Sequence, residues 1–186
     1  MKTVQDPEKI NKVKEFYENV TKSHYDFLDF WLKNTLFHWD FWLSLFLTII
    51  PWIIWIKYRK KESTGRLITC ILFVIFLSSW LDFIGTTYGL WFYTGKVIPT
   101  IPSYIPWDFS ILPIVISFFL QIKPEYSYIK KAFLFAGISA FIGEPIFIWL
   151  GFYVNLRWNV FYSFPIYLLI YIAAHKFSKI RGFDPI

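Results

Sequence analysis

Apolar residues fill five long runs of the chain, and charged residues gather between the runs. The runs extend over about 39–56, 67–92, 104–122, 132–153 and 158–177. A helix needs roughly 20 apolar residues to cross a hydrocarbon core about 30 Å thick. Each run is therefore long enough to span a bilayer, although the first and third are the shortest. The pattern predicts a five-helix transmembrane domain over residues 39–177.

Residues 1–38 show a different pattern. Lysines and acids are mixed there with apolar residues spaced by three or four, among them Phe16, Val20, Phe27 and Trp31. This spacing favours an amphipathic helix on the bilayer surface, with a poorly ordered terminus as the alternative. The expected fold class is all-α, namely a polytopic membrane helix bundle of about five transmembrane helices. The interfacial helix precedes the bundle, and a short cytoplasmic tail over 178–186 ends the chain.

Composition supports the membrane class. Of the 186 residues, 56% are hydrophobic and 24% aromatic, and only 17% are charged. The net charge of +6 falls in blocks between the apolar runs, so it reports membrane topology, and we expect no nucleic-acid partner. Cys70 is the only cysteine, which excludes an intramolecular disulfide or a cysteine metal cluster. The amino terminus lacks the pattern of a cleaved signal peptide, so the first span is expected to act as its own insertion signal.

The orientation is predicted from the basic residues of the connections, because positively charged loops stay on the cytoplasmic side. The first and third connections are rich in lysine and arginine, whereas the second and fourth carry only Lys96 and Arg157. Lys176, Lys179 and Arg181 lie at and beyond the end of the last run. We therefore expect an external amino terminus and a cytoplasmic carboxyl terminus. The amino-terminal segment, with six lysines and six acids, would have to be translocated.

Two carboxylates lie well inside the apolar runs. Asp82 and Glu144 are roughly 22 Å and 18 Å from the cytoplasmic start of their runs at a rise of about 1.5 Å per residue, so both fall in the outer half of the bilayer. An acid inside a span is costly, faces the bundle interior and is a functional hypothesis by default. These two residues are the principal candidates for a ligand-binding site. Unless a cation pairs with them, two neighbouring carboxylates cannot both stay ionised in a low dielectric.

Further candidates lie at the external ends of the runs. Asp40 opens the first run and Asp108 the third, where either carboxylate has the alternative role of capping a helix start. Arg157 lies in the fourth connection and has an interface anchor as its alternative. Tyr88 and Trp107 are aromatic candidates at the same level. Together with Asp82 and Glu144, these residues converge on the outer half of the bundle.

Two small-residue faces carry the principal acids. Asp82 shares a helical stripe with Gly85 and Gly89, and Glu144 shares one with Ala136 and Ala140. We expect these faces to pack against each other. Pro145, directly after Glu144, should kink its helix and free the carbonyl of Phe141.

The connection over 93–106 contains three prolines, which exclude a regular helix and favour a stiff, extended lid. A plain interface loop is the alternative. The sequence has no glycine-rich phosphate loop, no HExxH, no GxSxG and no aspartate-rich magnesium motif. The three histidines are too scattered for a metal site. We therefore expect no metal and no cofactor.

Several segments resemble a small multi-pass membrane family of spore-forming bacilli and clostridia. The resemblance covers roughly 39–177 and is carried by Leu81-Asp82-Phe83-Ile84-Gly85, Tyr88-Gly89-Leu90-Trp91, Ile101-Pro102-Ser103-Tyr104-Ile105-Pro106-Trp107-Asp108, Ile142-Gly143-Glu144-Pro145 and Tyr162-Ser163-Phe164-Pro165-Ile166-Tyr167. That family is uncharacterised. The resemblance implies a bacterial cytoplasmic membrane and no particular activity.

Three functional hypotheses remain open. The first is an outward-facing site within the membrane, lined by acids and aromatic rings, that binds or carries a proton, a cation or a small cationic solute. The second is a structural or accessory subunit of a membrane assembly, in which the acids hold helices together. The third is an enzyme that acts on a lipid or isoprenoid by acid catalysis, such as a membrane terpenoid cyclase. The expected partners are the bilayer, a second copy in a homodimer and a small cationic or lipid-like ligand.

Overall fold

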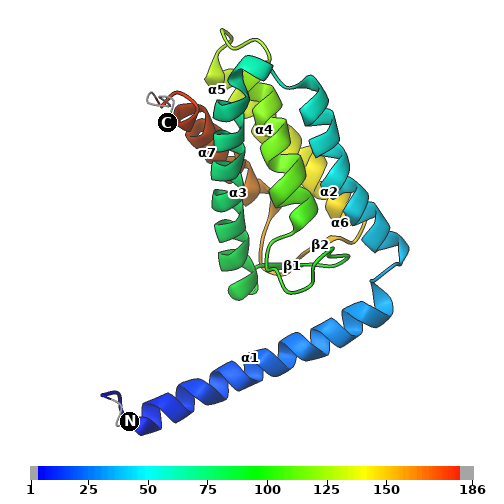
Figure 1. Cartoon of the computed structure of the whole chain (residues 1–186), viewed down its shortest axis with the longest axis vertical. Coiled ribbons are helices and arrows are strands. Elements are labelled where there is room, and N and C mark those ends of the chain that lie inside the picture. Colours follow the sequence, from blue (N-terminus) through cyan, green and yellow to red (C-terminus); the bar gives the residue numbers. More distant parts are fainter. Residues whose placement is uncertain (1–3, 181–186) are drawn as a thin grey trace.

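The computed structural model describes residues 4–180, and almost all of its regular structure is helical (Figure 1). The elements in chain order are α1 (Pro7–Asn34), α2 (Trp39–Tyr58), η1 (Lys61–Ser63), α3 (Thr64–Thr87), β1 (Trp91–Tyr93), η2 (Pro106–Ile111), α4 (Leu112–Gln121), α5 (Tyr128–Ile138), η3 (Ser139–Gly143), α6 (Glu144–Trp149), β2 (Tyr153–Asn155) and α7 (Val160–Phe177). The expected all-α class is confirmed at this level. Of the carboxyl-terminal tail expected over 178–186, residues 181–186 with Arg181 lie outside the described residues.

Four helical segments between residues 4 and 180 are long and apolar enough to cross a membrane. They are Trp39–Tyr58, Lys61–Thr87, Tyr128–Trp149 and Val160–Phe177. The third apolar run of the sequence forms a shorter helix, Pro106–Gln121. Apolar helices of this length are typical of membrane proteins.

The second and fourth apolar runs end earlier than the sequence pattern predicts. Each helix stops at a glycine with a left-handed backbone, Gly89 (φ 62°) after α3 and Gly151 (φ 78°) after α6. The N–H of Leu90 then donates to the carbonyl of Gly85, and the N–H of Phe152 to that of Phe147. Glycine accepts this conformation without steric cost, which is why it commonly terminates helices. The apolar residues beyond each glycine form the two strands.

The chain from α3 to α7 consists of two similar units, each a helix, a terminating glycine, a short strand and a second helix. β1 and β2 pair antiparallel, with Trp91 opposite Asn155, Phe92 opposite Val154 and Tyr93 opposite Tyr153. A shift of 62 residues carries Gly89 onto Gly151 and β1 onto β2, so the pairing has a local two-fold symmetry about the central pair. The same shift carries Asp82 onto Glu144. The two principal acids thus occupy equivalent positions, seven residues before the glycine that ends each helix.

Proline residues are accommodated by wide helical turns. The turn η3 precedes Pro145, and the N–H of Glu144 donates to the carbonyl of Ser139, five residues back. In η2, which precedes Pro113, the N–H of Leu112 bonds to the carbonyl of Trp107 in the same way. Proline has no N–H to donate within a helix, and each of these π-turns lies directly before a proline. The wider turn locally rotates the residues that follow it. A widened turn thus lies directly before Pro145, where the sequence suggested a kink.

The expected contact between two small-residue faces is wrong. α3 packs on α4, η2 and α7, whereas α5 packs chiefly on α7. The Cα of Gly85 lies against the indole of Trp91, and a Cβ at this position would be 2.0 Å from the ring. The space left by glycine on α3 therefore accepts an aromatic ring from β1, and no neighbouring helix backbone fills it.

The two ends of the bundle differ in packing. Away from the sheet, Cys70, Val74, Ile116, Ala132 and Ala174 belong to one tightly buried cluster. Near β1 and β2, at what we call the sheet end, the core is aromatic and includes Trp91, Tyr104, Phe147, Phe152 and Tyr153. A cavity lies at this end.

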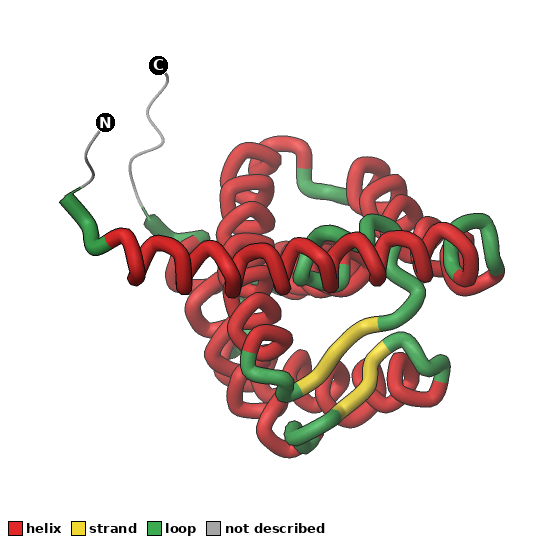
Figure 2. The backbone as a smooth tube through the Cα atoms, turned by 90° about the horizontal axis from the view of Figure 1, so that it is seen from below, coloured by secondary structure: helices red, strands yellow, loops and turns green. Residues whose placement is uncertain are grey.

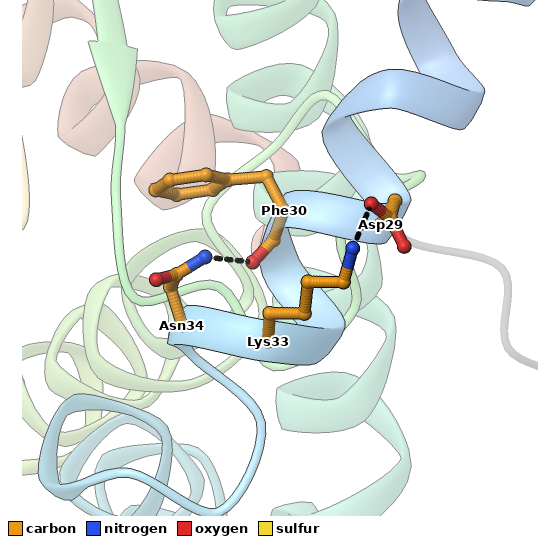
Figure 3. A network of polar contacts seen from close by, with 4 residues as sticks. All are labelled: Asp29, Phe30, Lys33 and Asn34. Carbon is orange, nitrogen blue, oxygen red and sulfur yellow. Dashed lines mark hydrogen bonds and ion pairs between the residues drawn. The ribbon is translucent and has the colours of Figure 1, made fainter.

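α1 lies outside the bundle and crosses its sheet end (Figures 1 and 2). Trp31 attaches it, because its indole N–H donates to the carbonyl of Lys96 (2.7 Å) and its ring packs edge-on against Phe41. Internal contacts support the last turns of the helix (Figure 3): Lys33 pairs with Asp29 (2.6 Å), and the Asn34 amide donates to the carbonyl of Phe30 (2.8 Å). Most of the remaining side chains of α1 are exposed.

Candidate functional site

A cavity of about 230 Å³ lies between α3, η2, α6 and α7 at the sheet end. Three carboxyl groups line it, Asp82, Asp108 and Glu144, and all three residues are at most 6% exposed. The other lining side chains are mostly aromatic or aliphatic. No lysine or arginine within residues 4–180 lines the cavity. It is therefore acidic, aromatic and secluded.

Asp82 is held by donors from three directions. Its Oδ1 accepts from the Tyr93 hydroxyl (2.7 Å) and from the Trp91 indole N–H (3.3 Å), both on β1. Its Oδ2 accepts from the backbone N–H of Tyr104 (3.1 Å). Hydrogen bonds to a carboxylate stabilise the charged form and fix its position. Asp82 thus links α3 to β1 and to the proline-rich connection.

Asp108 shares the backbone donor of Asp82. Its Oδ2 accepts from the N–H of Tyr104 at 3.0 Å, and its carboxyl group is within hydrogen-bond reach of the Asp82 carboxyl. Two carboxyl groups can hydrogen-bond to each other only if one of them carries a proton. Asp82 and Asp108 therefore form a close acid pair that shares one backbone donor.

Glu144 has fewer hydrogen-bond partners than Asp82. Its Oε1 accepts from the Ser163 hydroxyl (2.9 Å), which in turn accepts from the Trp158 indole N–H (2.9 Å). Its Oε2 is buried and has no hydrogen-bond partner among residues 4–180. The Tyr153 hydroxyl lies near this carboxyl group, at a geometry that leaves Oε2 unpaired. A buried polar atom without a partner is costly and calls for an explanation such as a ligand or a water.

Lys96 is the cation close to the acid pair. It is 9% exposed, and its ammonium group donates to the carbonyls of Ile101 (2.7 Å) and Pro102 (2.9 Å). Burial lowers the pKa of Lys96 to about 8, while Asp82 and Asp108 act in the opposite direction. Lys96 thus offsets the charge of the acid pair and fastens the proline-rich connection.

Three tyrosines form a wall of the cavity. The ring of Tyr93 stacks on Tyr104 (centroids 5.0 Å apart) and on Tyr153 (5.4 Å). Burial raises the pKa of each of these phenols. They therefore stay protonated at neutral pH, and Tyr93 donates a hydrogen bond to Asp82.

Four of the seven candidate residues from the sequence line the cavity: Asp82, Asp108, Glu144 and Trp107. The other three do not. Asp40 lies in the first turn of α2 beside Gly95, Arg157 is exposed, and Tyr88 is 73% exposed. Arg157 contributes only its backbone N–H, which donates to the carbonyl of Leu90. Of the five charged candidates, Asp82, Asp108 and Glu144 thus meet at the cavity, whereas Asp40 and Arg157 do not line it.

Sequence reasoning missed most of the hydrogen-bonding and aromatic partners. These are Trp91, Tyr93, Tyr104, Tyr153, Trp158, Ser163 and Tyr167. A signal was present for two of them, since Trp91 and Tyr93 alternate after Gly89 and so share one face of a strand. The prediction of a continuous helix to residue 92 concealed that alternation.

Within residues 4–180, no group of three or more histidine, cysteine, aspartate or glutamate side chains is placed to hold a metal ion. Comparisons of the chain with protein-family models, with curated proteins and with solved structures give no match. The chemistry of the cavity is therefore argued from its own residues. An anionic group surrounded by aromatic faces suits an organic cation, and a close pair of carboxyl groups suits acid catalysis.

Proposed function

We propose that this chain is a multi-pass membrane protein that binds a small organic cation in the acidic, aromatic cavity, with Glu144 as the anionic anchor. The observation that carries this proposal is the buried, unpartnered Oε2 of Glu144. Asp82 has three hydrogen-bond donors and a nearby lysine, whereas Glu144 accepts from the Ser163 hydroxyl alone and has the Tyr153 hydroxyl only as an unbonded neighbour. A ligand ammonium group would supply the missing partner.

The size and walls of the cavity support an organic ligand over a bare ion. Its volume of about 230 Å³ approaches the range of roughly 300–1,000 Å³ common for small-molecule sites. A proton or a single metal ion would leave most of this space unfilled. Faces of tyrosine and tryptophan rings attract quaternary and primary ammonium groups by about 2 kcal/mol or more when water is excluded.

The membrane placement is part of the proposal. Apolar helices α2, α3, α5 to α6 and α7 would span a bacterial cytoplasmic membrane, with the shorter η2 and α4 segment as the fifth crossing. Lysine and arginine are concentrated in the connections away from the sheet, which favours a cytoplasmic location for that end. The sheet end and the cavity would then lie in the outer half of the bilayer.

We propose that α1 lies on the outer surface of the same membrane. Its apolar residues, including Val13, Val20 and Phe27, fall on the side of the helix that Trp31 uses to contact the bundle. That side faces the level at which the apolar helices end. Residues 7–34 contain five lysines and five acids, so apolar contact, more than charge, would hold the helix to lipid.

Binding of butyltrimethylammonium by the purified protein in lipid nanodiscs tests the function. We expect saturable binding by calorimetry, and about 100-fold weaker binding by Glu144→Gln, because removal of one partner of a buried charge pair costs several kcal/mol. Asp40→Asn is the control, since it neutralises an acid outside the cavity. Equal affinity of wild type and Glu144→Gln would reject the proposal and favour the structural, accessory-subunit hypothesis.

The acid pair supports a second candidate, an acid-catalysed isomerisation of an isoprenoid. The protonated carboxyl of the pair would transfer its proton to one carbon of a carbon–carbon double bond, and aromatic rings would stabilise the resulting carbocation. Loss of a proton from carbon back to the carboxylate would give a cyclic or rearranged isomer of unchanged mass. Mass spectrometry and chromatography of isoprenoids incubated with the protein test this candidate. It requires product formation by wild type and none by Asp108→Asn.

A further inference from the structure

We infer that the cavity opens sideways between α3 and α7 toward the lipid, so that its ligand is an amphiphilic ammonium compound whose alkyl chain remains in the bilayer. This inference rests on the proposed function and specifies the class of ligand and its route of entry.

The sheet end is closed by aromatic rings. The indole of Trp91 covers Gly85 and meets the ring of Trp158 edge-on, with centroids 5.0 Å apart. Tyr104 and Tyr153, at 1% and 7% exposure, continue this cover. The N–H groups of Leu156 and Arg157 both donate to the carbonyl of Leu90, which ties the connection after β2 to the start of β1. These rings and hydrogen bonds cover the cavity at the sheet end.

The opposite end is closed as well. Leu112 and Ile170, which bound the cavity there, are 2% and 3% exposed, and they belong to the same buried cluster as Val74 and Ala174. Close-packed aliphatic side chains leave no passage for a ligand along the bundle axis.

The flank of the bundle is different. Ile84 of α3 is the one lining residue of the cavity, among residues 4–180, that is clearly exposed, at 47%. Leu81 of α3 and Ile166 of α7 also line the cavity and are half-buried. Ile84 lies within the apolar segment Lys61–Thr87, so its exposed side would contact acyl chains and not water.

An apolar opening at this depth favours ligands that carry an alkyl chain. An attached alkyl chain would keep a charged headgroup in the membrane and so favour its passage between Leu81, Ile84 and Ile166 to Glu144. The chain could then stay in the opening while the headgroup enters the aromatic site. Charged small solutes without such a chain would not concentrate at this depth.

The test compares two probes, butyltrimethylammonium and dodecyltrimethylammonium, with the protein in nanodiscs. Both probes carry the same trimethylammonium headgroup, which tests binding at Glu144. Only the dodecyl probe tests the opening, because a twelve-carbon chain does not fit within the cavity. Two variants accompany wild type. Ile84→Trp fills the opening, and Ile68→Trp adds the same bulk at an exposed position of α3 that does not line the cavity.

We expect the dodecyl probe to bind at least as tightly as the butyl probe, and Ile84→Trp to weaken or slow its binding about tenfold while Ile68→Trp does not. Glu144→Gln should weaken both probes. Glu144-dependent binding of the butyl probe alone, or an Ile84→Trp variant that binds the dodecyl probe as wild type does, would overturn the lateral opening and leave the proposed function intact. If neither probe depends on Glu144, both proposals fail.

Discussion

Each of the two units of the bundle has an acid at the same position, but the two acids differ in their hydrogen-bond partners. Asp82 and Glu144 each lie seven residues before the glycine that ends their helix. The first acid has three donors, a second carboxyl group and a nearby lysine. The second has one hydroxyl donor and an unpaired oxygen. Equivalent positions in a repeated architecture therefore do not imply equivalent roles.

The difference arises from the connection after each strand. After β1, a connection rich in proline brings Tyr104, Lys96 and Asp108 against Asp82. After β2, only four residues precede α7, and Ser163 is the side chain that reaches Glu144. The longer connection thus surrounds Asp82 with groups that hold it in place, which gives this acid a structural role. The shorter connection leaves one carboxyl oxygen of Glu144 available to a ligand.

Replacement of the two acids by alanine should separate these roles most clearly. Asp82→Ala leaves two donors, the Trp91 indole N–H and the Tyr93 hydroxyl, without an acceptor, and we expect it to destabilise the fold by about 3 kcal/mol or more. Glu144→Ala removes a buried, poorly paired group, and its effect should stay within about 1 kcal/mol. Thermal unfolding of the purified variants in detergent measures both. A comparable loss of stability in the two variants would contradict the division.

The contact between Gly85 and Trp91 gives the next largest effect. Gly85→Ala would force the indole away from α3 and disturb its bond to Asp82, at a cost of about 2 kcal/mol. Gly137→Ala is the matched control, because a Cβ there meets nothing within 4 Å, and a helical alanine is slightly more stable than glycine. The indole environment is read from tryptophan fluorescence alongside the unfolding temperature. No difference between the two variants would argue against the close approach of Trp91.

Lys96 should make the first unit sensitive to pH. Its pKa of about 8 in the folded protein lies below the ordinary value of 10.5, so the unfolded chain holds more protons between these two pH values. This group therefore makes the folded state more stable as pH rises, by about 1 kcal/mol between pH 8 and 9.

The variant Lys96→Met should lack this pH-dependent contribution. Unfolding temperatures of wild type and Lys96→Met, measured across pH 7 to 10, check it. Parallel pH profiles would show that Lys96 is not the responsible group.

Residues outside the cavity should have the smallest effects. Arg157→Gln and Tyr88→Leu change exposed side chains, and we expect stability to change by less than about 0.5 kcal/mol. Binding of butyltrimethylammonium should also stay at the wild-type level in the calorimetric assay. A tenfold loss of affinity in either variant would place the site closer to these residues than the geometry supports.

The sequence by itself determined the helical class and three of the cavity acids. Long apolar runs predict helices, because only intrahelical hydrogen bonds satisfy the backbone in an apolar setting. Asp82 and Glu144 were identifiable because an acid within such a run is costly unless it has partners or a function. Asp108 was named as well, with helix capping as the alternative, and in the structure it joins Asp82 instead.

Only the tertiary structure decided which residues meet at the cavity and which acid remains unsatisfied. Hydrophobic periodicity does not distinguish an apolar helix end from an apolar strand, so β1, β2 and the aromatic wall were not predicted. The partners of each acid come from distant parts of the chain: Tyr104 reaches Asp82, and Ser163 reaches Glu144. Such contacts depend on the three-dimensional packing of the two units, and that packing leaves Oε2 of Glu144 without a partner among residues 4–180.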